Sequence, residues 1–336
     1  MPEDKLPNKQ DYLILVQPKV SIIIPVFKAE KDIERCCKAL FEQTLDSIEY
    51  IFVNDCTPDG SVAIIEKTLV EYPKRKSNVK ILHQPQNMGV SACRQLGLDN
   101  ATGEYVIHCD SDDWPDLDMY EILYDTAVKE EAEVVCCDYV VEYEGKSVVV
   151  RFPDKYNDRP SFNTGPIEGA VWNKLISKNL IKRIDAEFYQ GVNLGEDFGF
   201  VTPCRVMSRK NMVVHKPMYH YNQLNLNSIT HNYTKERFLQ VVEVAKRMDT
   251  YLTKRQKARE YEKELCNLKF MSKMYFLIFS EVRDIKLWKS LFPECHKYIL
   301  TYDVPVYLKL SAWFIANGME RLGGAILSLK TKLSGY

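Results

Sequence analysis

The sequence contains no long hydrophobic run. No window approaches the roughly 18 apolar residues that a membrane-spanning helix needs. The first residues, MPEDKLPNKQDYLILVQ, also lack the basic region and following apolar stretch of a secretory signal. We therefore expect residues 1–17 to be a polar leader and the protein to act in the cytoplasm, on the membrane only as a peripheral protein.

An excess of charge of one sign and patterned cysteines are missing too. The 45 Lys and Arg balance the 46 Asp and Glu, which leaves no basic footprint for nucleic acid. The ten cysteines show neither disulfide-framework spacing nor paired C-x-x-C motifs for zinc, so we expect reduced thiols. A hydrophobic content of 46% suits a chain with a real core, in one large domain or two.

What is present is an alternation of apolar strands and amphipathic helices. Val20–Val26 is apolar on both faces, as a central parallel strand is. The alternation predicts a right-handed parallel α/β sheet flanked by helices. Its expected strands are Val20–Val26, Tyr50–Val53, Lys80–His83 and Tyr105–Cys109, and its expected helices are Glu30–Phe41, Val62–Val70 and Val90–Leu98.

After Trp114 the pattern becomes less regular. We expect a hairpin over Tyr139–Phe152 that turns at Glu144 and Gly145. Residues 153–166, rich in Pro, Asn and Asp, resemble a loop over an active site. The remaining expected elements are helices at Met119–Lys129, Ala170–Ser177 and Leu194–Met207, and strands at Ala132–Cys137 and Met212–His215.

From Thr234 onward helical periodicity dominates, so we place a boundary near residue 233 and expect a helical region over 234–336. Apolar residues there alternate in steps of four and three, as in a heptad seam. Gly318, Gly323 and Gly324 would weaken a free helix. Three interpretations of residues 305–333 remain open: a helix packed on its own domain, a basic amphipathic helix at a membrane surface, or a dimer seam. The seam consists of Leu308, Ala312, Ile315, Met319, Leu322, Ile326, Leu329 and Leu333.

Three aspartates follow the strand Tyr105–Cys109. The carboxyl ends of parallel strands are where open α/β sheets bind ligands. Asp110, Asp112 and Asp113 would repel one another, and a hard cation such as Mg²⁺ or Mn²⁺ relieves that repulsion. The alternative is a solvated acidic turn in which Asp113 caps a helix that starts near Pro115.

Four motifs occur in order within residues 18–231. Together they resemble family 2 glycosyltransferases of the GT-A fold, inverting enzymes that use nucleotide-diphosphate sugars. The resemblance implies a nucleotide-sugar-binding part over 18–115 and an acceptor part over 116–233. It departs at Cys93 and Gln95, where the family more often has Ala and Asn. The motifs are VSIIIPVFKAEKDIERCCKAL, IEYIFVNDCTPDGS, NMGVSACRQLGLDNATGEYVIHCDSDDW and GEDFGF.

The resemblance implies the donor-binding residues. Asp110 and Asp112 match the aspartates that bind the metal, with Asp112 facing the ion, and Ser111 and Asp113 lie beside them near the donor sugar. Asp55 would accept a hydrogen bond from the nucleobase, unless it only bonds its own turn. Further donor contacts fall on Pro25, Phe27 and Glu30, which would line the base and ribose pocket unless Phe27 is core, and on Arg94, which would pair with the diphosphate or else with an acidic loop.

The acceptor hydroxyl needs a general base, because its pKa lies far above neutrality. The resemblance favours Asp197 as that base and Glu196 as the second choice, against plain capping of the helix they begin. Other side chains have a functional and a structural interpretation. They are Trp114 and Trp172, as sugar-stacking or core residues, and His215, His220 and His231, as neighbours of the metal or structural residues.

The combined prediction is an inverting, metal-dependent transferase that moves a sugar from a UDP-sugar to a hydroxyl of a glycan or lipid-linked glycan. The resemblance implies a role in bacterial cell-surface polysaccharide synthesis. A nucleotidyltransferase would have a glycine-rich basic loop after the first strand, which PVFKAEKD lacks. A catalytically idle scaffold subunit would have no use for a positioned base such as Asp197.

Overall fold

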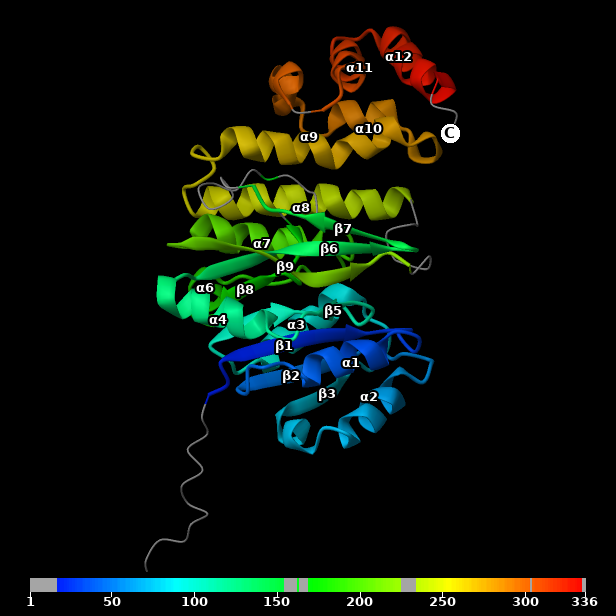
Figure 1. Ribbon diagram of the computed structural model, residues 1–336. Helices are drawn as coiled ribbons and strands as arrows, with labels where there is room; N and C mark the ends of the chain where they lie inside the picture. Colours follow the sequence, from blue (N-terminus) through cyan, green and yellow to red (C-terminus); the bar gives the residue numbers. More distant parts are fainter. Residues whose placement is uncertain (1–16, 154–161, 163–168, 225–233, 303, 334–336) are drawn as a thin grey trace, which may run out of the picture.

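The fold is built on one large mixed sheet with helices on both faces and a separate stack of helices at one end (Figure 1). The computed structural model describes residues 17–153, 162, 169–224, 234–302 and 304–333. The expectations for the leader, for nearly all of the loop 153–166 and for His231 lie outside these residues.

The N-terminal part has the predicted parallel α/β arrangement. Strands pair in the order β3-β2-β1-β4, all parallel, which confirms the alternation seen in the sequence. β1 is buried along nearly its whole length, as expected of a central strand. The elements are β1 (Val20–Val26), α1 (Ile33–Phe41), β2 (Ile48–Asn54), α2 (Ser61–Val70), a 3₁₀ turn (Pro73–Asn78), β3 (Val79–His83), α3 (Val90–Asn100) and β4 (Tyr105–His108).

Beyond β4 the sheet continues with antiparallel partners. β8 pairs with β4 and with β6, and β9 lies parallel to β6. At the edges, β5 pairs with β9 and β7 pairs with β6. The hairpin turn at Glu144 and Gly145 is confirmed, since Tyr143 pairs with Lys146. The elements are β5 (Trp114–Pro115), α4 (Met119–Glu130), β6 (Val134–Tyr143), β7 (Lys146–Val150), β8 (Lys174–Ser177), α6 (Lys178–Ile184), α7 (Glu196–Met207) and β9 (Asn211–Asn222).

Two local expectations were wrong. The expected helix Ala170–Ser177 contains strand β8 instead, because a short apolar run fits either element and its neighbours β4 and β6 select the strand. The expected helix Met119–Lys129 is confirmed as α4, whereas the alternative of a helix that starts near Pro115 was wrong. Trp114 and Pro115 pair with β9, so they belong to the sheet.

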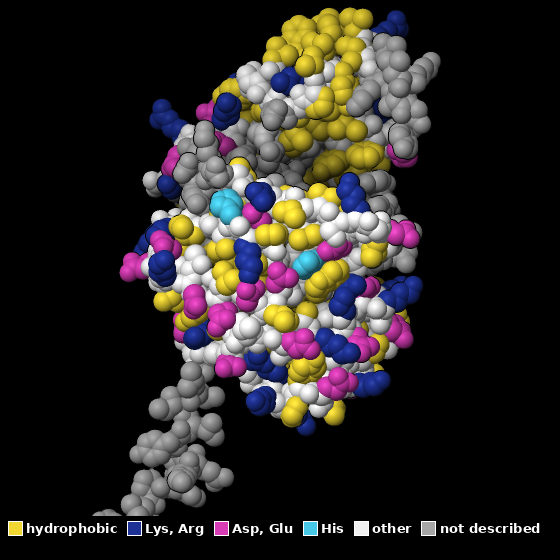
Figure 2. Space-filling model, in the orientation of Figure 1, with side chains coloured by type: hydrophobic (Ala, Val, Ile, Leu, Met, Phe, Trp, Pro, Cys, Tyr) yellow, Lys and Arg dark blue, Asp and Glu magenta, His cyan; other side chains and the backbone are white. Residues whose placement is uncertain are grey.

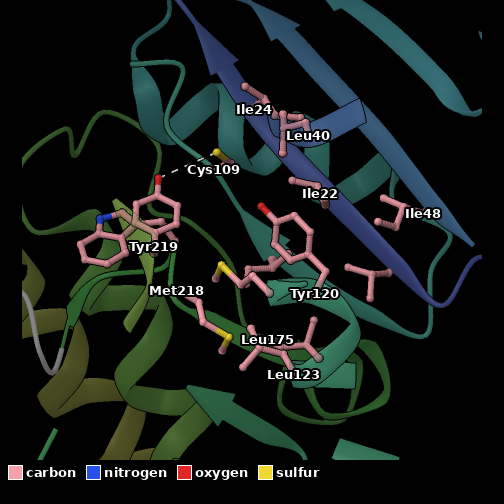
Figure 3. Close-up of a cluster of buried hydrophobic side chains, with 14 of the residues drawn as sticks. Ile22, Ile24, Leu40, Ile48, Cys109, Tyr120, Leu123, Leu175, Met218 and Tyr219 are labelled. Atoms are coloured by element: carbon pink, nitrogen blue, oxygen red, sulfur yellow. Dashed lines mark hydrogen bonds between the residues drawn. The ribbon is translucent and has the colours of Figure 1, made fainter. Parts of the chain in front are cut away.

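Two hydrophobic clusters cover the opposite faces of the sheet. One places Ile22 and Ile24 of β1 against α1 and α4, with Tyr120 and Leu123 of α4 buried there (Figure 3). The other takes the alternate residue, Ile23, toward α3, α6 and α7. This alternation fixes the register of β1, because a slip of one residue would exchange its two faces.

The C-terminal region is a stack of helices that contacts the α/β part through α7 and α8 (Figure 1). α8 starts just after the expected boundary, and the hydroxyl of Thr234 caps it by accepting from the backbone N–H of Arg237. None of the helices in the described ranges combines the length and hydrophobicity needed to span a bilayer. The helices are α8 (Lys235–Lys254), α9 (Glu262–Ile278), α10 (Ile285–Ser290), α11 (Val306–Ala316) and α12 (Glu320–Leu333), with 3₁₀ segments at Ser280–Val282 and Pro293–Thr301.

The expected heptad seam is not one helix. The chain reverses at Gly318, whose φ is +83°, so α11 and α12 form a hairpin. Gly323 permits the two helices to approach closely, since a Cβ there would lie 2.7 Å from the carbonyl oxygen of Ser311. Leu308, Ala312 and Ile315 face the core of the helical region, as expected for a helix packed on its own domain.

Candidate active site

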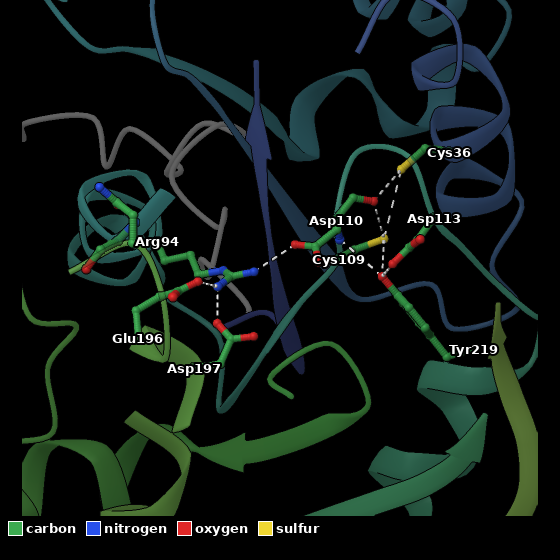
Figure 4. Close-up of polar contacts among 10 residues, drawn as sticks. Cys36, Arg94, Cys109, Asp110, Asp113, Glu196, Asp197 and Tyr219 are labelled. Carbon is green, nitrogen blue, oxygen red and sulfur yellow. Dashed lines mark hydrogen bonds and ion pairs between the residues drawn. The ribbon is translucent and has the colours of Figure 1, made fainter. Parts of the chain in front are cut away.

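Arg94 lies at the centre of the candidate site. From α3, one nitrogen of its guanidinium donates to Asp110 (2.8 Å), and the other donates to Glu196 (2.8 Å) and to Asp197 (Figure 4). The Arg94 side chain is only 3% exposed. A single buried cation therefore brings together the acidic loop after β4 and the first turn of α7.

The charges of this cluster do not balance. Burial alone would lower the pKa of Arg94, but Asp197, Asp110 and Glu196 raise it, so the guanidinium stays charged. Burial raises the pKa of Asp197 well above its usual range, with Glu196 and Asp110 adding to the rise and Arg94 opposing it. Three carboxyl groups share one cation here, and a further cation nearby would relieve the repulsion that raises the pKa of Asp197.

Asp113 does not cap a helix, and its carboxylate is held within the fold. Its side chain is fully buried, and it caps no helix, because Asp118 precedes α4. One carboxylate oxygen accepts from the Tyr219 hydroxyl (2.8 Å) and the other from the backbone N–H of Asn222 (2.7 Å). The same hydroxyl accepts from the backbone N–H of Asp110 (3.1 Å). Asp113 and Tyr219 thus fasten the acidic loop to β9 (Figure 4).

A second set of contacts holds the backbone of Asp112. Its carbonyl oxygen accepts from the guanidinium of Arg35 (2.9 Å) and from the side-chain amide of Asn222 (3.1 Å). The same guanidinium lies 3.9 Å from the centre of the Trp114 ring, and His220 stacks on this ring at 5.1 Å. Trp114 therefore has both a cation and a ring partner within the chain.

The remaining aromatic and histidine candidates have structural contacts. Trp172 is buried and stacks on Tyr219 at 4.5 Å, and Tyr219 in turn supports the acidic loop. His220 bonds Glu142 (2.7 Å) and Asp116 (3.1 Å). His215 lies 3.6 Å from Asp138. The structural interpretation is therefore the better one for these three side chains.

The expected nucleobase residues lie at the ends of β1 and β2. Phe27 is 41% exposed, so it is not a core residue. Asp55 is buried and accepts from the backbone N–H groups of Met88 (2.7 Å) and Gly89 (2.9 Å). It thus ties down a loop more than thirty residues away, rather than bonding its own turn, and carboxylate oxygens retain further lone pairs for a ligand.

Pro25 and Glu30 complete the expected pocket. Pro25 is the partly buried penultimate residue of β1, and Glu30 is exposed and accepts from the backbone N–H of Gly60 (3.2 Å). Ser111 and Asp112 are half-buried in the acidic loop. The sequence-predicted donor residues therefore lie at one edge of the parallel strands, as the pattern indicated.

The acidic loop fits a cation that arrives with phosphate. Within the part of the chain that the structure describes, no group of three or more His, Cys, Asp and Glu forms a ready metal cage. Asp110 and Asp112 offer carboxylate oxygens from a partly open loop. Mg²⁺ is commonly held by one or two carboxylates, with substrate phosphates and water as the other ligands.

Sequence reasoning missed three residues that shape the loop: Arg35, Tyr219 and Asn222. Arg35 carried no signal beyond its place in the first motif. Tyr219 and Asn222 lie in a polar, aromatic stretch that gave no indication of which strand it would join. Their contacts depend on β9 meeting the loop, a pairing over more than one hundred residues.

The parallel strands of the α/β sheet end at an acidic loop, and this loop faces the acidic first turn of α7. This arrangement is that of a glycosyltransferase of the GT-A fold. The chain belongs to glycosyl transferase family 2, whose sequence model matches residues 21–213. The first family motif begins at β1 and the matched span ends within β9, so it contains every residue predicted to bind the donor or the metal or to act as the base.

Individual proteins resemble the chain over most of its length. The putative glycosyltransferase EpsH of Bacillus subtilis is 31% identical over 283 residues, which cover 81% of this chain and 78% of EpsH. S. aureus TarS 1–349, solved in complex with UDP-GlcNAc, has a TM-score of 0.65 at 16% identity and covers 94% of this chain and 92% of its own. The mannosyltransferase PcManGT from Pyrobaculum calidifontis, solved with GDP-Man and Mn²⁺, has a TM-score of 0.50 at 16% identity, over 95% of this chain and 81% of its own.

Proposed function

We propose that this glycosyltransferase is inverting and metal-dependent, with a UDP-sugar as donor and a hydroxyl of a glycan or lipid-linked glycan as acceptor. The carrying observation is the contact of Arg94 with both Asp110 and Asp197. It puts the loop suited to a metal and diphosphate next to a carboxylate suited to deprotonate an acceptor. A role in the synthesis of cell-surface polysaccharide agrees with the family resemblance.

The donor half of the proposal rests on the acidic loop. Asp110 and Asp112 would hold the cation, which stabilises the negative charge that builds on the leaving diphosphate. Tyr219 and Arg35 keep the loop backbone in place through the N–H of Asp110 and the carbonyl of Asp112. Asp55 lies at the end of β2, where its remaining lone pairs can accept from the nucleobase.

The acceptor half rests on Asp197. A base works best when its pKa lies near the working pH, and burial moves the pKa of this carboxyl upward. The side chain is 24% exposed, so an acceptor hydroxyl can reach it. Arg94 orients the carboxylate and keeps it from repelling Asp110. Glu196 is less exposed than Asp197 and stays the second choice.

A nucleotide panel tests the donor and the metal together. Melting temperature is measured with UDP, GDP, dTDP and CMP, each with and without Mn²⁺, for the wild type and Asp112→Ala. A ligand that binds the folded state raises the melting temperature by mass action. We expect a rise with UDP that needs both Mn²⁺ and Asp112. A larger rise with another nucleotide would change the proposed donor. A rise that is the same with and without Mn²⁺ would contradict the proposed metal dependence.

The stereochemical outcome tests the base. Attack by the acceptor from the face opposite the diphosphate inverts the anomeric carbon, and this is the step that needs a base such as Asp197. The anomeric configuration of the product is read by NMR after transfer from the donor identified above. A product that retains the donor configuration would sink the assignment of Asp197.

A further inference from the structure

Exposed apolar side chains are concentrated in the C-terminal helical region. Among the described residues, fifteen large hydrophobic side chains are exposed, and five of them fall between residues 300 and 322. Figure 2 shows hydrophobic side chains gathered over the end of the molecule at α11, whereas the α/β part displays mixed charges. The five residues, which we call the C-terminal apolar surface, are Leu300, Val306, Leu310, Trp313 and Leu322.

The surface is the outer face of a helix whose inner face is already used. Val306, Leu310 and Trp313 follow one another in steps of four and three, which places them on one side of α11. Leu308 and Ile315, on the other side, pack in the core of the helical region. The outer side chains are 69%, 42% and 37% exposed, although burying such groups is favourable. α11 is therefore apolar on two sides, and one of them lacks a covering element in the described chain.

Positive charge accompanies this surface. Residues 285–336 hold seven Lys and Arg against three Asp and Glu, a net charge of +4, whereas the whole chain has a net charge of -1. Two of these seven cations are paired, Lys289 with Glu320 at 2.6 Å and Lys297 with Glu262 at 3.0 Å. Arg321 is exposed beside Leu322 on α12. An apolar surface that carries a tryptophan and has cations on the same two helices, Lys309 on α11 and Arg321 on α12, matches the interface of an anionic bilayer.

We propose that the C-terminal apolar surface docks the protein on an anionic membrane surface. Trp313, Leu310 and Val306 enter the boundary between headgroups and acyl chains, and Lys309 and Arg321 contact the lipid phosphates. A second copy of the chain fits less well, because pairing two such surfaces would bring two regions of charge +4 together. Docking does not depend on the identity of the sugar donor or the catalytic base.

Flotation of the full-length protein with lipid vesicles tests the proposal. Vesicles of phosphatidylcholine alone are compared with vesicles that also contain phosphatidylglycerol, at low and high salt. The test variant is the double substitution Leu310→Glu and Trp313→Glu. The control is Val70→Glu and Val128→Glu, which adds the same charges at exposed apolar positions on α2 and α4.

We expect binding to the phosphatidylglycerol vesicles that weakens with salt. The test variant should bind at least about tenfold more weakly. It loses two apolar side chains that would enter the bilayer, and it gains two negative charges that the anionic lipids repel. The control variant should bind like the wild type. A second variant, Arg321→Glu, should weaken binding while it leaves the apolar side chains in place.

Three results would overturn the proposal. The first is a wild type that binds neither kind of vesicle, and the second is a test variant that binds like the wild type at an unchanged melting temperature. The third is a wild-type dimer in sedimentation that the test variant converts to a monomer, with vesicle binding by neither protein, which would assign the surface to self-association. Nucleotide binding measured on the same variants should be unchanged, so a failure here is distinguishable from a failure of the proposed catalytic function.

Discussion

Arg94 and Asp197, which are 103 positions apart in the sequence, form an ion pair that joins α3 to the first turn of α7. The same guanidinium reaches Asp110, so one side chain links the two halves of the candidate site. Neither half would hold this geometry alone, because three carboxylates gathered without the cation repel one another.

Arg94→Ala should therefore destabilise the fold as well as the site. Removing one partner of a buried ion pair costs about 3–5 kcal/mol, and the partial exposure of Asp110 and Asp197 places the expected loss near the lower limit. Urea unfolding measures it. The double variant Arg94→Ala with Asp110→Asn should recover part of the loss, because one uncompensated charge is gone. Equal unfolding free energies for the two variants would contradict the electrostatic explanation.

Asp197→Asn separates catalysis from binding. The amide keeps the size of the side chain but cannot take a proton, so we expect kcat to fall by about 10²–10⁴-fold. The thermal shift with nucleotide should persist, since we propose that Asp197 acts on the acceptor and not on the nucleotide. Glu196→Gln is the matched control and should lose less activity. A larger loss in the Glu196 variant would exchange the two assignments.

Tyr219→Phe tests the support of the acidic loop. The substitution deletes the hydroxyl that donates to Asp113 and accepts from the N–H of Asp110, and it leaves the ring stacked on Trp172. A buried group that loses a hydrogen-bond partner costs about 1–3 kcal/mol. We expect a lower melting temperature and a weaker Mn²⁺-dependent response to nucleotide. If the metal response is unchanged while stability falls, Tyr219 only supports the fold.

Gly89→Ala tests the loop held by Asp55. Gly89 has a φ of +87°, and a Cβ there would lie 2.4 Å from the side-chain oxygen of Asn193. Gly145→Ala is the control, because Gly145 also has a positive φ (+67°) but nothing within 4 Å of the added Cβ. A side chain in such a backbone conformation costs about 1–3 kcal/mol, and Gly89, with a ψ of 164°, lies in a region that almost only glycine adopts. The Gly89 variant should lose more than the control, and equal losses would mean that Asn193 moves aside freely.

Local sequence patterns predicted the parallel half of the fold well. Val20–Val26 and the acidic loop could be located because a buried strand and its carboxyl end are properties of neighbouring residues. Strand β8 and the partners of Asp113 could not, because they depend on which distant segment the strand meets. Asp113 was taken for a ligand or a cap, yet its burial follows from Tyr219 and Asn222 arriving on β9. The residues next to Asp113 in the sequence do not indicate that it would meet Tyr219 and Asn222.

A buried lysine in the helical region should make the stability of the protein depend on pH. Lys273 of α9 is fully buried, lies 4.3 Å from the centre of the Trp288 ring and donates to the backbone oxygen of Trp288 (3.2 Å) and to His296 (2.6 Å). Burial lowers the pKa of Lys273 to about 7. The unfolded chain keeps the ordinary pKa of about 10.4.

Between these two values the unfolded state binds a proton that the folded state does not, so stability should rise as the pH increases from 7 to 9. The slope from this one group is at most about 1.4 kcal/mol per pH unit. Lys273→Met removes the titrating group and should flatten the rise in urea-unfolding free energy. Lys269→Met is the control, since ion pairs with Asp249 and Glu294 raise the pKa of Lys269 despite its burial, and its charge is the same in both states over this range. That variant should lose stability equally at every pH, and parallel curves for wild type and Lys273→Met would show that Lys273 stays protonated in the folded protein.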